Sequence, residues 1–354
     1  MSTDADQTLE LAERVRAASA DRTPLRVIGG DTKPGYGRAV RGGQLSVRGH
    51  AGIVHYDAAE LVITARGGTP LREINEVLAA SGQHLPFEPP APGAQATLGG
   101  TIAAGLAGPS RATHGPVRDF VLGVRVLAGD GRVLRFGGEV MKNVAGYDVS
   151  RLMAGSLGIL GVLLDVSLKV LPVPPARRTL VFELDAPAAL RRMAQLASTN
   201  LPVSASCWID GRWYLRLDAA PPTLDTAARR LGGESLADPD TFWEGVREQT
   251  LPSFAPGGSL WRVNVPAQCG PLALPAPCCI EWNGALRWYA DVDPARVRAV
   301  AAGAAGFSTW FRGAPPDEEV FAPLPPALLN LHRALKQVFD PAGVLNPGRM
   351  YRGL

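Results

Sequence analysis

The spacing of apolar residues in the first third of the chain predicts alternating helices and strands. Residues 8–19 are expected to form a helix, and residues 25–28 a short strand that runs into a Gly-Gly turn. A second helix is expected over residues 70–81, with Thr69 as its N-cap and Gly82 as its left-handed stop. The apolar stripe of this second helix consists of Leu71, Ile74, Val77 and Leu78.

Prolines then interrupt the pattern, and the chain becomes rich in strands. Four prolines predict an extended connection over residues 86–96. Residues 121–127 and 133–136 flank a Gly-Asp-Gly turn and predict a hairpin. Apolar and polar residues alternate over 162–170, so we expect a strand that covers a core with one face only. The polar face of this strand consists of Asp165, Ser167 and Lys169.

The second half of the chain has fewer glycines and mixes helices with strands. Helices are expected over residues 186–198, 223–231, 294–302 and 327–339, and strands over 179–184, 205–209, 213–217, 260–265 and 279–290. This order predicts an α+β fold with an antiparallel sheet. We expect a first domain over residues 1–175, a second α+β domain over 176–320, and a C-terminal tail over 321–354.

Glycines are concentrated between residues 98 and 161. Fourteen of the 40 glycines of the chain lie in this run, which alternates with strand-like segments and lacks the repetitive composition of a linker. Glycine clustered in this way lets the backbone bend sharply or lie directly against a ligand. The run therefore indicates a large bound cofactor.

Composition and charge narrow the possible functions. A chain of 354 residues is long for one core, so two domains are expected. The net charge of +3, with scattered Lys and Arg, does not support nucleic-acid binding. The sequence has neither a secretory signal nor a stretch near the ~18 apolar residues that span a membrane. We expect a cytoplasmic protein, with any contact to the inner membrane made through a partner.

The four cysteines do not indicate a metal site. Cys207, Cys269, Cys278 and Cys279 contain no C-x-x-C pair, and adjacent residues on a strand point to opposite faces. We expect buried or free thiols, and neither zinc nor an iron–sulfur cluster.

Two segments are candidates for phosphate binding. Residues 29–33 follow a strand, so their N–H groups can converge on an anion while Thr32 and Lys33 add donors. The second segment is the small-residue loop 97–105; either segment could instead be a packed glycine turn. The sequence has no G-x-G-x-x-G after a strand and no G-x-x-x-x-G-K-[ST], which disfavours a Rossmann dehydrogenase and a P-loop NTPase.

Longer strings of residues resemble the vanillyl-alcohol-oxidase-type, or PCMH-type, FAD-binding proteins, and within them the FAD-binding subunits of bacterial glycolate oxidases. The likeness covers nearly the whole chain and is densest from residue 25 to 172. The matching strings are Gly29–Lys33, Leu85–Pro89, Thr97–Gly108, His114–Asp119, Lys142–Asp148, Gly155–Gly161, Glu281–Trp288 and Phe339–Arg349.

The resemblance implies a two-lobed FAD-binding domain, followed by the α+β antiparallel-sheet domain and a tail that returns to the flavin. It implies that the pyrophosphate contacts Gly29, Gly30, Asp31, Thr32 and Lys33, and that the dinucleotide contacts Gly99, Gly100, Thr101, Ala103, Gly105 and Gly115. It places Gly161 and Val162 at the adenine and Asn346 near the flavin ring. Some members attach FAD through a histidine in the first phosphate loop. This loop reads Gly-Gly-Asp-Thr, so non-covalent FAD is expected.

Catalytic residues are not assigned. Related hydroxy-acid-oxidising flavoproteins carry a metal-associated histidine cluster in the second domain, whereas no histidine of this chain lies between residues 115 and 331. Related catalytic proteins also read Gly-Ser-Glu-Gly where this chain has Gly-Ser-Leu-Gly at 155–158. No carboxylate pair or histidine motif suggests a base.

For several charged and aromatic residues, two interpretations remain open. Arg111 and Arg118 either clamp an anion or lie solvated in turns. Lys142 and Asp148 form either an ion pair or flavin contacts. The strand that contains Trp282, Arg287 and Trp288 either packs through cation–π contacts or faces a partner.

The resemblance implies an FAD-dependent oxidoreductase subunit of a glycolate oxidase (dehydrogenase) complex that converts glycolate to glyoxylate. The chain would be an accessory or electron-relaying subunit beside a homologous catalytic FAD subunit and an iron–sulfur subunit. Two alternatives are a self-sufficient FAD-dependent D-2-hydroxy-acid dehydrogenase and a non-catalytic scaffold without cofactor. The missing histidines argue against the first alternative, and the intact phosphate loops argue against the second.

Overall fold

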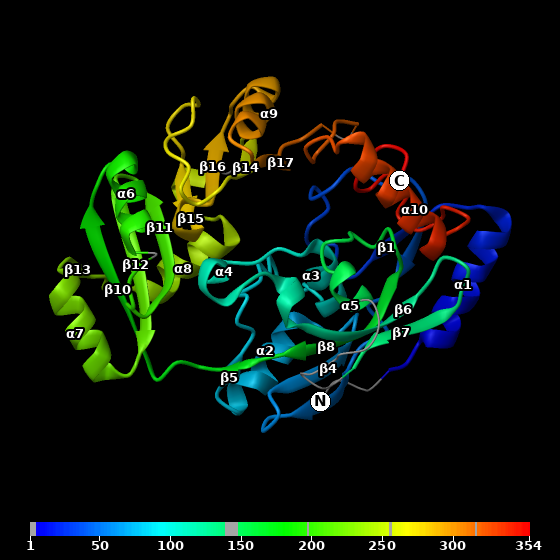
Figure 1. Cartoon of the computed structure of the whole chain (residues 1–354). Coiled ribbons are helices and arrows are strands. Elements are labelled where there is room, and N and C mark those ends of the chain that lie inside the picture. Colours follow the sequence, from blue (N-terminus) through cyan, green and yellow to red (C-terminus); the bar gives the residue numbers. More distant parts are fainter. Residues whose placement is uncertain (1–4, 139–147, 197, 255–256, 316) are drawn as a thin grey trace.

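The computed structural model describes residues 5–138, 148–196, 198–254, 257–315 and 317–354. Most of the Lys142–Asp148 string therefore lies outside the described residues, as does the proposed pairing of Lys142 with Asp148. Two antiparallel sheets organise the chain, one on each side of the molecule as drawn in Figure 1. This arrangement confirms the predicted α+β class.

The first sheet has five antiparallel strands in the order β3-β4-β8-β6-β7. Two small sheets accompany it: the parallel pair β1·β2 and the antiparallel pair β5·β9. The strands are β1 (Leu25–Ile28), β2 (Gly43–Ser46), β3 (Ile53–Asp57), β4 (Val62–Arg66), β5 (Gln83–His84), β6 (Val121–Leu127), β7 (Val133–Gly137), β8 (Val162–Lys169) and β9 (Leu171–Pro172). The helices are α1 (Thr8–Asp21), α2 (Leu71–Ala80), α3 (Leu98–Ala104), α4 (Arg111–His114) and α5 (Val149–Leu152).

The second sheet has eight antiparallel strands in the order β13-β10-β12-β11-β15-β16-β14-β17. Its strands are β10 (Ala176–Glu183), β11 (Val203–Ile209), β12 (Arg212–Ala219), β13 (Glu234–Ser235), β14 (Leu260–Asn264), β15 (Cys279–Glu281), β16 (Leu286–Ala290) and β17 (Phe307–Arg312). The helices of this half are α6 (Ala186–Leu196), α7 (Pro221–Leu231), α8 (Pro239–Glu248), α9 (Pro294–Gly303) and, in the tail, α10 (Pro326–Phe339). No helix among the described residues is long and apolar enough to cross a membrane.

The tail returns to the first sheet. In Figure 1, α10 and the C-terminus lie beside β1, away from the β13 end of the second sheet. The backbone of Leu25 in β1 donates to Val344 O at 2.7 Å and accepts from Asn346 N at 2.9 Å. Residues at opposite ends of the chain are thus hydrogen-bonded neighbours. The domain boundaries at 175 and 320 stay predictions.

Most predicted elements are confirmed, but the cap of α2 was predicted wrongly. Pro70 occupies the N-cap position and makes no side-chain cap. The Thr69 hydroxyl instead donates to Gly52 O at 3.1 Å and accepts from Gly52 N at 3.0 Å. The hydroxyl is thus already bonded to the backbone of Gly52, 17 residues earlier, and local sequence does not reveal this partner. Gly82 has the predicted left-handed backbone, with φ of 64°.

The prediction that β8 covers a core with one face only was also wrong. Asp165 and Ser167 on its polar face are buried, with 6% and 7% exposure. Ser167 shares a 2.8 Å hydrogen bond with Thr64 on β4, and Asp165 forms a 2.5 Å ion pair with Arg125 on β6. Neighbouring strands supply these polar partners, so the polar side of the central strand is buried as well.

The predicted strand over 279–290 is two strands. Trp282 and Asn283 have φ of 54° and 55° and Gly284 has φ of 92°, so the chain turns there and β16 pairs back on β15. Three residues in the left-handed region cannot continue an extended strand. The prediction also omitted α8 and β17.

Candidate functional site

A cavity lies where the residues after β1 face α3 and the tail. Its lining includes nine predicted FAD contacts, namely Gly29, Gly30, Asp31, Thr32, Lys33, Gly100, Thr101, Ala103 and Asn346. An adjoining cavity shares Gly29, Gly100, Ala103 and Asn346 with the first and adds the predicted residues Gly99, Gly161 and Val162. The fold thus brings twelve of the fourteen predicted residues to one continuous groove.

The loop 29–33 offers free hydrogen-bond donors to this groove. In the described part of the chain, the backbone N–H groups of these five residues donate to no protein acceptor. The Thr101 hydroxyl, also in the lining, is buried and has no described partner. Buried or clustered donors without acceptors are the expected setting for an anionic phosphate. These residues therefore fit the pyrophosphate of FAD.

The second glycine segment differs from the first in its N–H groups. Leu98 N donates to Thr69 O at 2.9 Å, and Gly99 N donates to Gly67 O at 2.8 Å. Gly100 N donates to the Thr97 side chain at 3.3 Å, which caps α3. The first turn of α3 is therefore already satisfied by protein, and its small residues shape the wall of the groove.

Glycine is required where the two segments meet. A Cβ placed on Gly30 would lie 1.6 Å from Gln95 O, and a Cβ on Gly29 would lie 2.2 Å from Thr97 Oγ1. Contacts below about 3 Å require atoms to move, and at Gly30 the atom that must move belongs to the backbone. The two glycines let the loop after β1 lie directly on the residues that precede α3.

Three cationic side chains border the groove. Arg26 is held by Asp31 at 2.7 Å, and Arg349 donates to the carbonyls of Lys33, Tyr36 and Arg38 at 3.2, 3.0 and 3.2 Å. Among the described residues, the Lys33 ammonium has no hydrogen-bonding or ion-pair partner. Burial lowers the pKa of Lys33 to about 8, although Glu248 acts in the opposite direction. Positive charge at the groove suits the diphosphate of a dinucleotide.

Asn346 holds the tail in the wall of the groove. Its side-chain oxygen accepts from Val27 N at 2.8 Å, and its amide donates to Leu157 O at 2.8 Å. Both amide atoms of this side chain are thus engaged by protein backbone. Asn346 lines the groove, and its predicted contact with the flavin ring stays a prediction.

Gly105 and Gly115 are the two predicted residues that do not line either cavity. Gly105 ends α3 with φ of 64°, and a Cβ there would lie 2.8 Å from Gly155 Cα. Gly115 follows α4 with φ of 102°. Both positions need glycine for a turn, which explains the residue type without a ligand contact.

Sequence reasoning missed Arg26, Tyr36 and Arg349 as lining residues, whereas Thr97 had been included in the second candidate phosphate segment. Arg349 stands directly after Asn-Pro-Gly in a string that had been singled out, so the string itself was the available signal. Tyr36 and Arg26 stand near the first phosphate loop but carry no spacing that marks them.

The structure shows no metal-binding arrangement among the described residues. All four cysteines are free, with Cys207 and Cys279 buried and their sulfur atoms 3.4 Å apart. Burial raises the pKa of both thiols and raises the pKa of Cys278 to about 12. Thiols with raised pKa values are poor nucleophiles and poor ligands at neutral pH.

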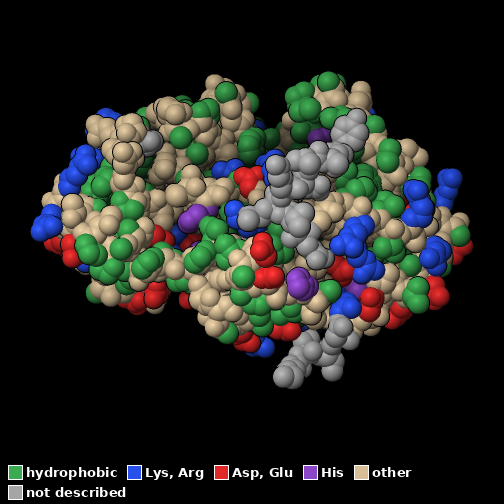
Figure 2. Space-filling view, turned by 60° about the horizontal axis from the view of Figure 1, so that its bottom comes forward, with side chains coloured by type: hydrophobic (Ala, Val, Ile, Leu, Met, Phe, Trp, Pro, Cys, Tyr) green, Lys and Arg blue, Asp and Glu red, His purple; other side chains and the backbone are tan. Residues whose placement is uncertain are grey.

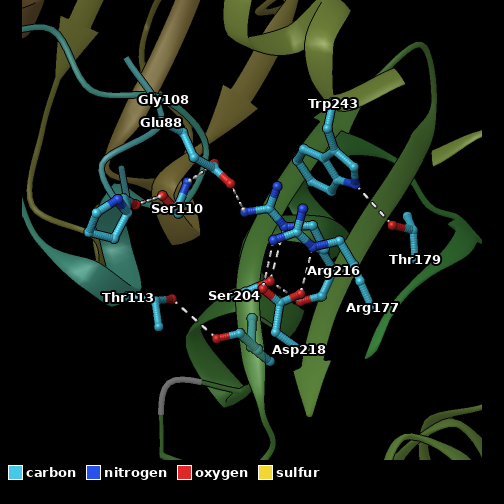
Figure 3. Close-up of polar contacts among 12 residues, drawn as sticks. Glu88, Gly108, Ser110, Thr113, Arg177, Thr179, Ser204, Arg216, Asp218 and Trp243 are labelled. Carbon is cyan, nitrogen blue, oxygen red and sulfur yellow. Dashed lines mark hydrogen bonds and ion pairs between the residues drawn. The ribbon is translucent and has the colours of Figure 1, made fainter. Parts of the chain in front are cut away.

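Side chains at the contact between the two sheets form a connected polar network, drawn in Figure 3. Glu88 links the segment before α4 to the second sheet. It accepts from Ser110 N at 3.1 Å and pairs with Arg216 of β12 at 2.8 Å. Arg216 is 2% exposed and also donates to Ser204 at 3.0 Å. This network fixes the second sheet against the loop that precedes α4.

Basic residues do not gather into a stripe on the face shown in Figure 2, where Lys and Arg alternate with Asp and Glu. This face therefore carries no basic stripe of the kind that binds nucleic acid.

Comparison with known proteins agrees with the geometry of the groove. Residues 4–137 match the family model described as FAD binding domain, and residues 319–350 match the model described as FAD linked oxidases, C-terminal domain. The second match covers α10 and the residues around Asn346 and Arg349. The matched regions are those that form the loop after β1, α3 and the tail.

Individual relatives extend this result. The chain is 46% identical to the glycolate oxidase subunit GlcE of Escherichia coli (strain K12) over 355 residues, which cover 100% of both chains. It is 30% identical to the glycolate oxidase subunit GlcD of Bacillus subtilis (strain 168) over 49% of this chain and 37% of the relative. A D-lactate dehydrogenase of Anaerostipes hadrus is 30% identical over 50% of this chain and 38% of the relative.

A solved structure supports the fold. An alkyldihydroxyacetonephosphate synthase superposes with a TM-score of 0.66 at 16% identity, over 96% of this chain and 74% of that chain. This likeness confirms the predicted two-lobed FAD-binding architecture with its second sheet. The relatives and the two family models make FAD the cofactor. The chain belongs to the family of the glycolate oxidase subunit GlcE, to which it is similar along its full length.

Proposed function

We propose that this chain is the FAD-binding subunit of a glycolate oxidase complex that oxidises glycolate to glyoxylate. Full-length similarity to a glycolate oxidase subunit supports the assignment. The structural observation that carries it is the loop 29–33: its five residues line a groove bordered by Arg26, Lys33 and Arg349, and their backbone N–H groups have no acceptor among the described residues. Such a loop binds a dinucleotide diphosphate without a covalent bond.

The site residues take the following roles in this proposal. Gly29, Gly30, Asp31, Thr32 and Lys33 hold the pyrophosphate, with the Thr101 hydroxyl as a further donor. Gly99, Gly100 and Ala103 leave room for the dinucleotide, and Gly161 and Val162 contact the adenine. Asn346 positions the tail beside the flavin, while Gly105 and Gly115 shape the turns around α3 and α4. FAD bound there supplies hydride and electron transfer.

An accessory or electron-relaying role fits the second sheet better than substrate oxidation. The sequence has no histidine between residues 115 and 331, so the cluster that would accept a proton is missing there. Glu281 is a buried carboxyl of this sheet, and its Oε1 accepts from the Trp288 indole at 2.6 Å. We propose that a homologous FAD subunit performs the oxidation, that an iron–sulfur subunit accepts electrons, and that the complex is cytoplasmic or held at the inner membrane by its partners.

The domain division accompanies this proposal. Residues 1–175 form the FAD-binding domain, 176–320 the α+β cap, and 321–354 the tail. A buried contact supports the packing of the tail on the first domain. The Lys336 ammonium donates to Ile159 O at 2.8 Å, in the glycine-rich segment whose neighbours line the groove.

The test separates the three functional hypotheses. The chain is purified alone and together with its candidate partners, and flavin content and glycolate-dependent dye reduction are measured for both. We expect the isolated chain to be yellow with released FAD but inactive, and the complex to be active. Turnover by the isolated chain would favour a self-sufficient dehydrogenase. A colourless chain that takes up no FAD would favour a scaffold.

A matched pair of variants tests the groove in the complex. Gly30→Ala places its Cβ on Gln95 O, whereas Gly35→Ala lies in the same loop with no atom within 4 Å of the new Cβ. We expect only Gly30→Ala to lose FAD from this subunit. Equal FAD content in the two variants would contradict the assignment of the loop.

A further inference from the structure

A cavity of about 240 Å³ lies on the second sheet, apart from the FAD groove. It is bounded by the start of α6, by strands β15 and β16, and by the loop 271–277, which belongs to the connection from β14 to β15. Ten of its twelve lining residues are apolar, with Leu190, Leu274 and Ile280 among them. The other two are Arg287 and Tyr289 of β16, so the cavity combines apolar walls with two polar side chains.

Strand β16 places Arg287 and Tyr289 on the face of the sheet that points away from the FAD groove. Side chains alternate along a strand, and Trp288 between them packs on the opposite face, in one cluster with Trp282. The Trp282 indole donates to Gly108 O at 2.9 Å, so this opposite face is the one that meets the segment before α4. In Figure 1, α6, β15 and β16 accordingly lie on the left of the molecule, far from α10. The cavity is therefore not part of the flavin site.

Arg287 is a buried cation without a counter-ion. Its side chain is 1% exposed, and among the described residues it forms no ion pair. The guanidinium donates to three backbone carbonyls, namely Gly284 O at 3.2 Å, Gly270 O at 2.6 Å and Cys269 O. A guanidinium has five N–H donors and a full charge, so three neutral carbonyls leave donors and charge unbalanced. None of the described residues that line the cavity is acidic, and the site is thus short of negative charge.

Tyr289 adds a hydroxyl group beside this charge. It is 2% exposed, and burial raises the pKa of Tyr289 to about 12, although the charge of Arg287 acts in the opposite direction. The hydroxyl therefore stays protonated at neutral pH and can donate a hydrogen bond. A guanidinium and a phenol on the same face of one strand are complementary to a carboxylate.

The loop that covers the cavity is held by side chains from two elements. Arg287 binds the carbonyls of residues 269 and 270 at its start, and Arg296 of α9 donates to Ala273 O at 3.0 Å. Three prolines within residues 271–277 restrict its backbone further. The walls are thus preformed, which lowers the entropic cost of binding a ligand.

We propose that this cavity binds a small organic monocarboxylate with an apolar body, with Arg287 and Tyr289 at the carboxylate and the leucine and proline walls around the body. An apolar cavity of about 150 Å³ holds a benzene ring, so this volume admits roughly ten non-hydrogen atoms. The charge of Arg287 disfavours cations, and the apolar walls disfavour phosphate and other strongly hydrated anions. The site is separate from the proposed oxidation of glycolate and does not depend on it.

The experiment measures the binding of phenylacetate, whose size matches this volume, to the FAD-loaded chain by titration calorimetry. Phenylacetamide is the uncharged control of the same size, and acetate is the charged control without an apolar body. We expect saturable binding of phenylacetate, and a Kd at least about tenfold higher for each control, because each lacks one half of the match to the cavity. The flavin absorbance spectrum, recorded in parallel, should not change, because the cavity lies on the other face of the sheet.

A matched pair of variants locates the ligand. Ala276 lines the cavity, whereas Ala273 lies in the same loop without lining it, and both residues are exposed. Ala276→Phe should raise the Kd of phenylacetate at least about tenfold by filling part of the cavity, and Ala273→Phe should leave it unchanged. Tyr289→Phe removes only the hydroxyl and should raise Kd severalfold. Arg287→Gln should abolish binding; because Arg287 also holds the loop, the alanine pair decides the outcome if that variant does not fold.

Four results would overturn the proposal. They are no saturable binding of phenylacetate by the wild-type chain, equal binding of phenylacetamide or acetate, an unchanged Kd in Ala276→Phe, and a flavin spectrum that changes as phenylacetate saturates. The last result would place the ligand in the FAD groove instead of this cavity.

Discussion

The substitution Lys336→Met tests how the tail is held against the FAD-binding unit. The Lys336 ammonium is buried and donates to Ile159 O at 2.8 Å, to Asp340 Oδ2 at 2.6 Å and to Leu345 O at 2.6 Å. It therefore links α10 both to the end of the glycine-rich segment and to the residues that lead to Asn346. Methionine has a similar length and volume but cannot donate.

The loss of stability caused by Lys336→Met depends on the hydrogen bonds that Asp340 keeps. Asp340 is 1% exposed and would keep two backbone donors, Val344 N at 3.1 Å and Leu345 N at 2.7 Å, but lose its counter-ion. Removing one partner of a buried ion pair costs roughly 3–5 kcal/mol. Because Asp340 keeps these two hydrogen bonds, we expect the lower end, about 3 kcal/mol. Packing adds little, since the volume is nearly conserved.

The assay is urea unfolding of the FAD-loaded chain, followed by flavin fluorescence and circular dichroism. Lys336→Met should lower the free energy of unfolding by about 3 kcal/mol, and adding Asp340→Asn should recover part of the loss because no unpaired charge remains. Arg333→Met, exposed on the same helix, should change stability by less than about 0.5 kcal/mol. A loss below about 1 kcal/mol for Lys336→Met would refute the argument that this pair fixes the tail.

Three further predictions follow from single contacts. Gly30→Ala should weaken FAD binding at least about tenfold in a fluorescence titration of the apo chain, because the loop must move off Gln95 O; Gly35→Ala is the control. FAD affinity should fall as pH rises through about 8, where Lys33 loses its proton, and Lys33→Met should remove this pH dependence. Wild-type stability should fall as pH rises from about 4.5 through about 7, because the folded state keeps the Glu281 proton longer than the unfolded state does. In urea titrations, the Glu281→Gln variant should lose less stability between these pH values and be roughly 3 kcal/mol more stable than the wild type at pH 8. Stability profiles that run parallel in variant and wild type would contradict the raised pKa of Glu281.

Local patterns were sufficient where neighbours in sequence decide the structure. The amphipathic stripe of α2 and the Gly-Asp-Gly turn between β6 and β7 both act over a few residues, and both elements are where they were expected. The prediction that Thr69 caps α2 failed because a residue outside the local sequence decides its contact. Its hydroxyl binds Gly52, 17 residues away, so a residue suited to capping does not cap.

Alternation on a strand does not reveal what covers each face. The polar residues of β8 read as a solvent-facing side, yet Asp165 pairs with Arg125, 40 residues away. Polar residues with buried partners and polar residues in water look alike in sequence. The Asn283-Gly284 pair is a common turn signal that the prediction of one strand over 279–290 overlooked, whereas Trp282 carries no such signal.

The candidate site was predictable to the extent that glycine marks it. Glycines 29, 30, 99 and 100 are visible in the sequence, and the fold brings them together. Contacts that join distant segments were not visible: Asn346 reaches Leu157 across 189 residues, and Trp282 reaches Gly108 across 174. The cation–π contacts of Arg111 and Arg262 with the Trp282 ring also required the fold, although Arg111 and Trp282 had each been noted.

The central claim is that this chain holds FAD without a covalent bond through the loop 29–33. Its most direct test is acid precipitation of the purified chain, with the flavin in supernatant and pellet identified and quantified against protein. We predict that all flavin is recovered in the supernatant as intact FAD, in stoichiometric amount. Flavin retained in the pellet, or a folded chain that takes up no FAD when it is supplied, would contradict the claim.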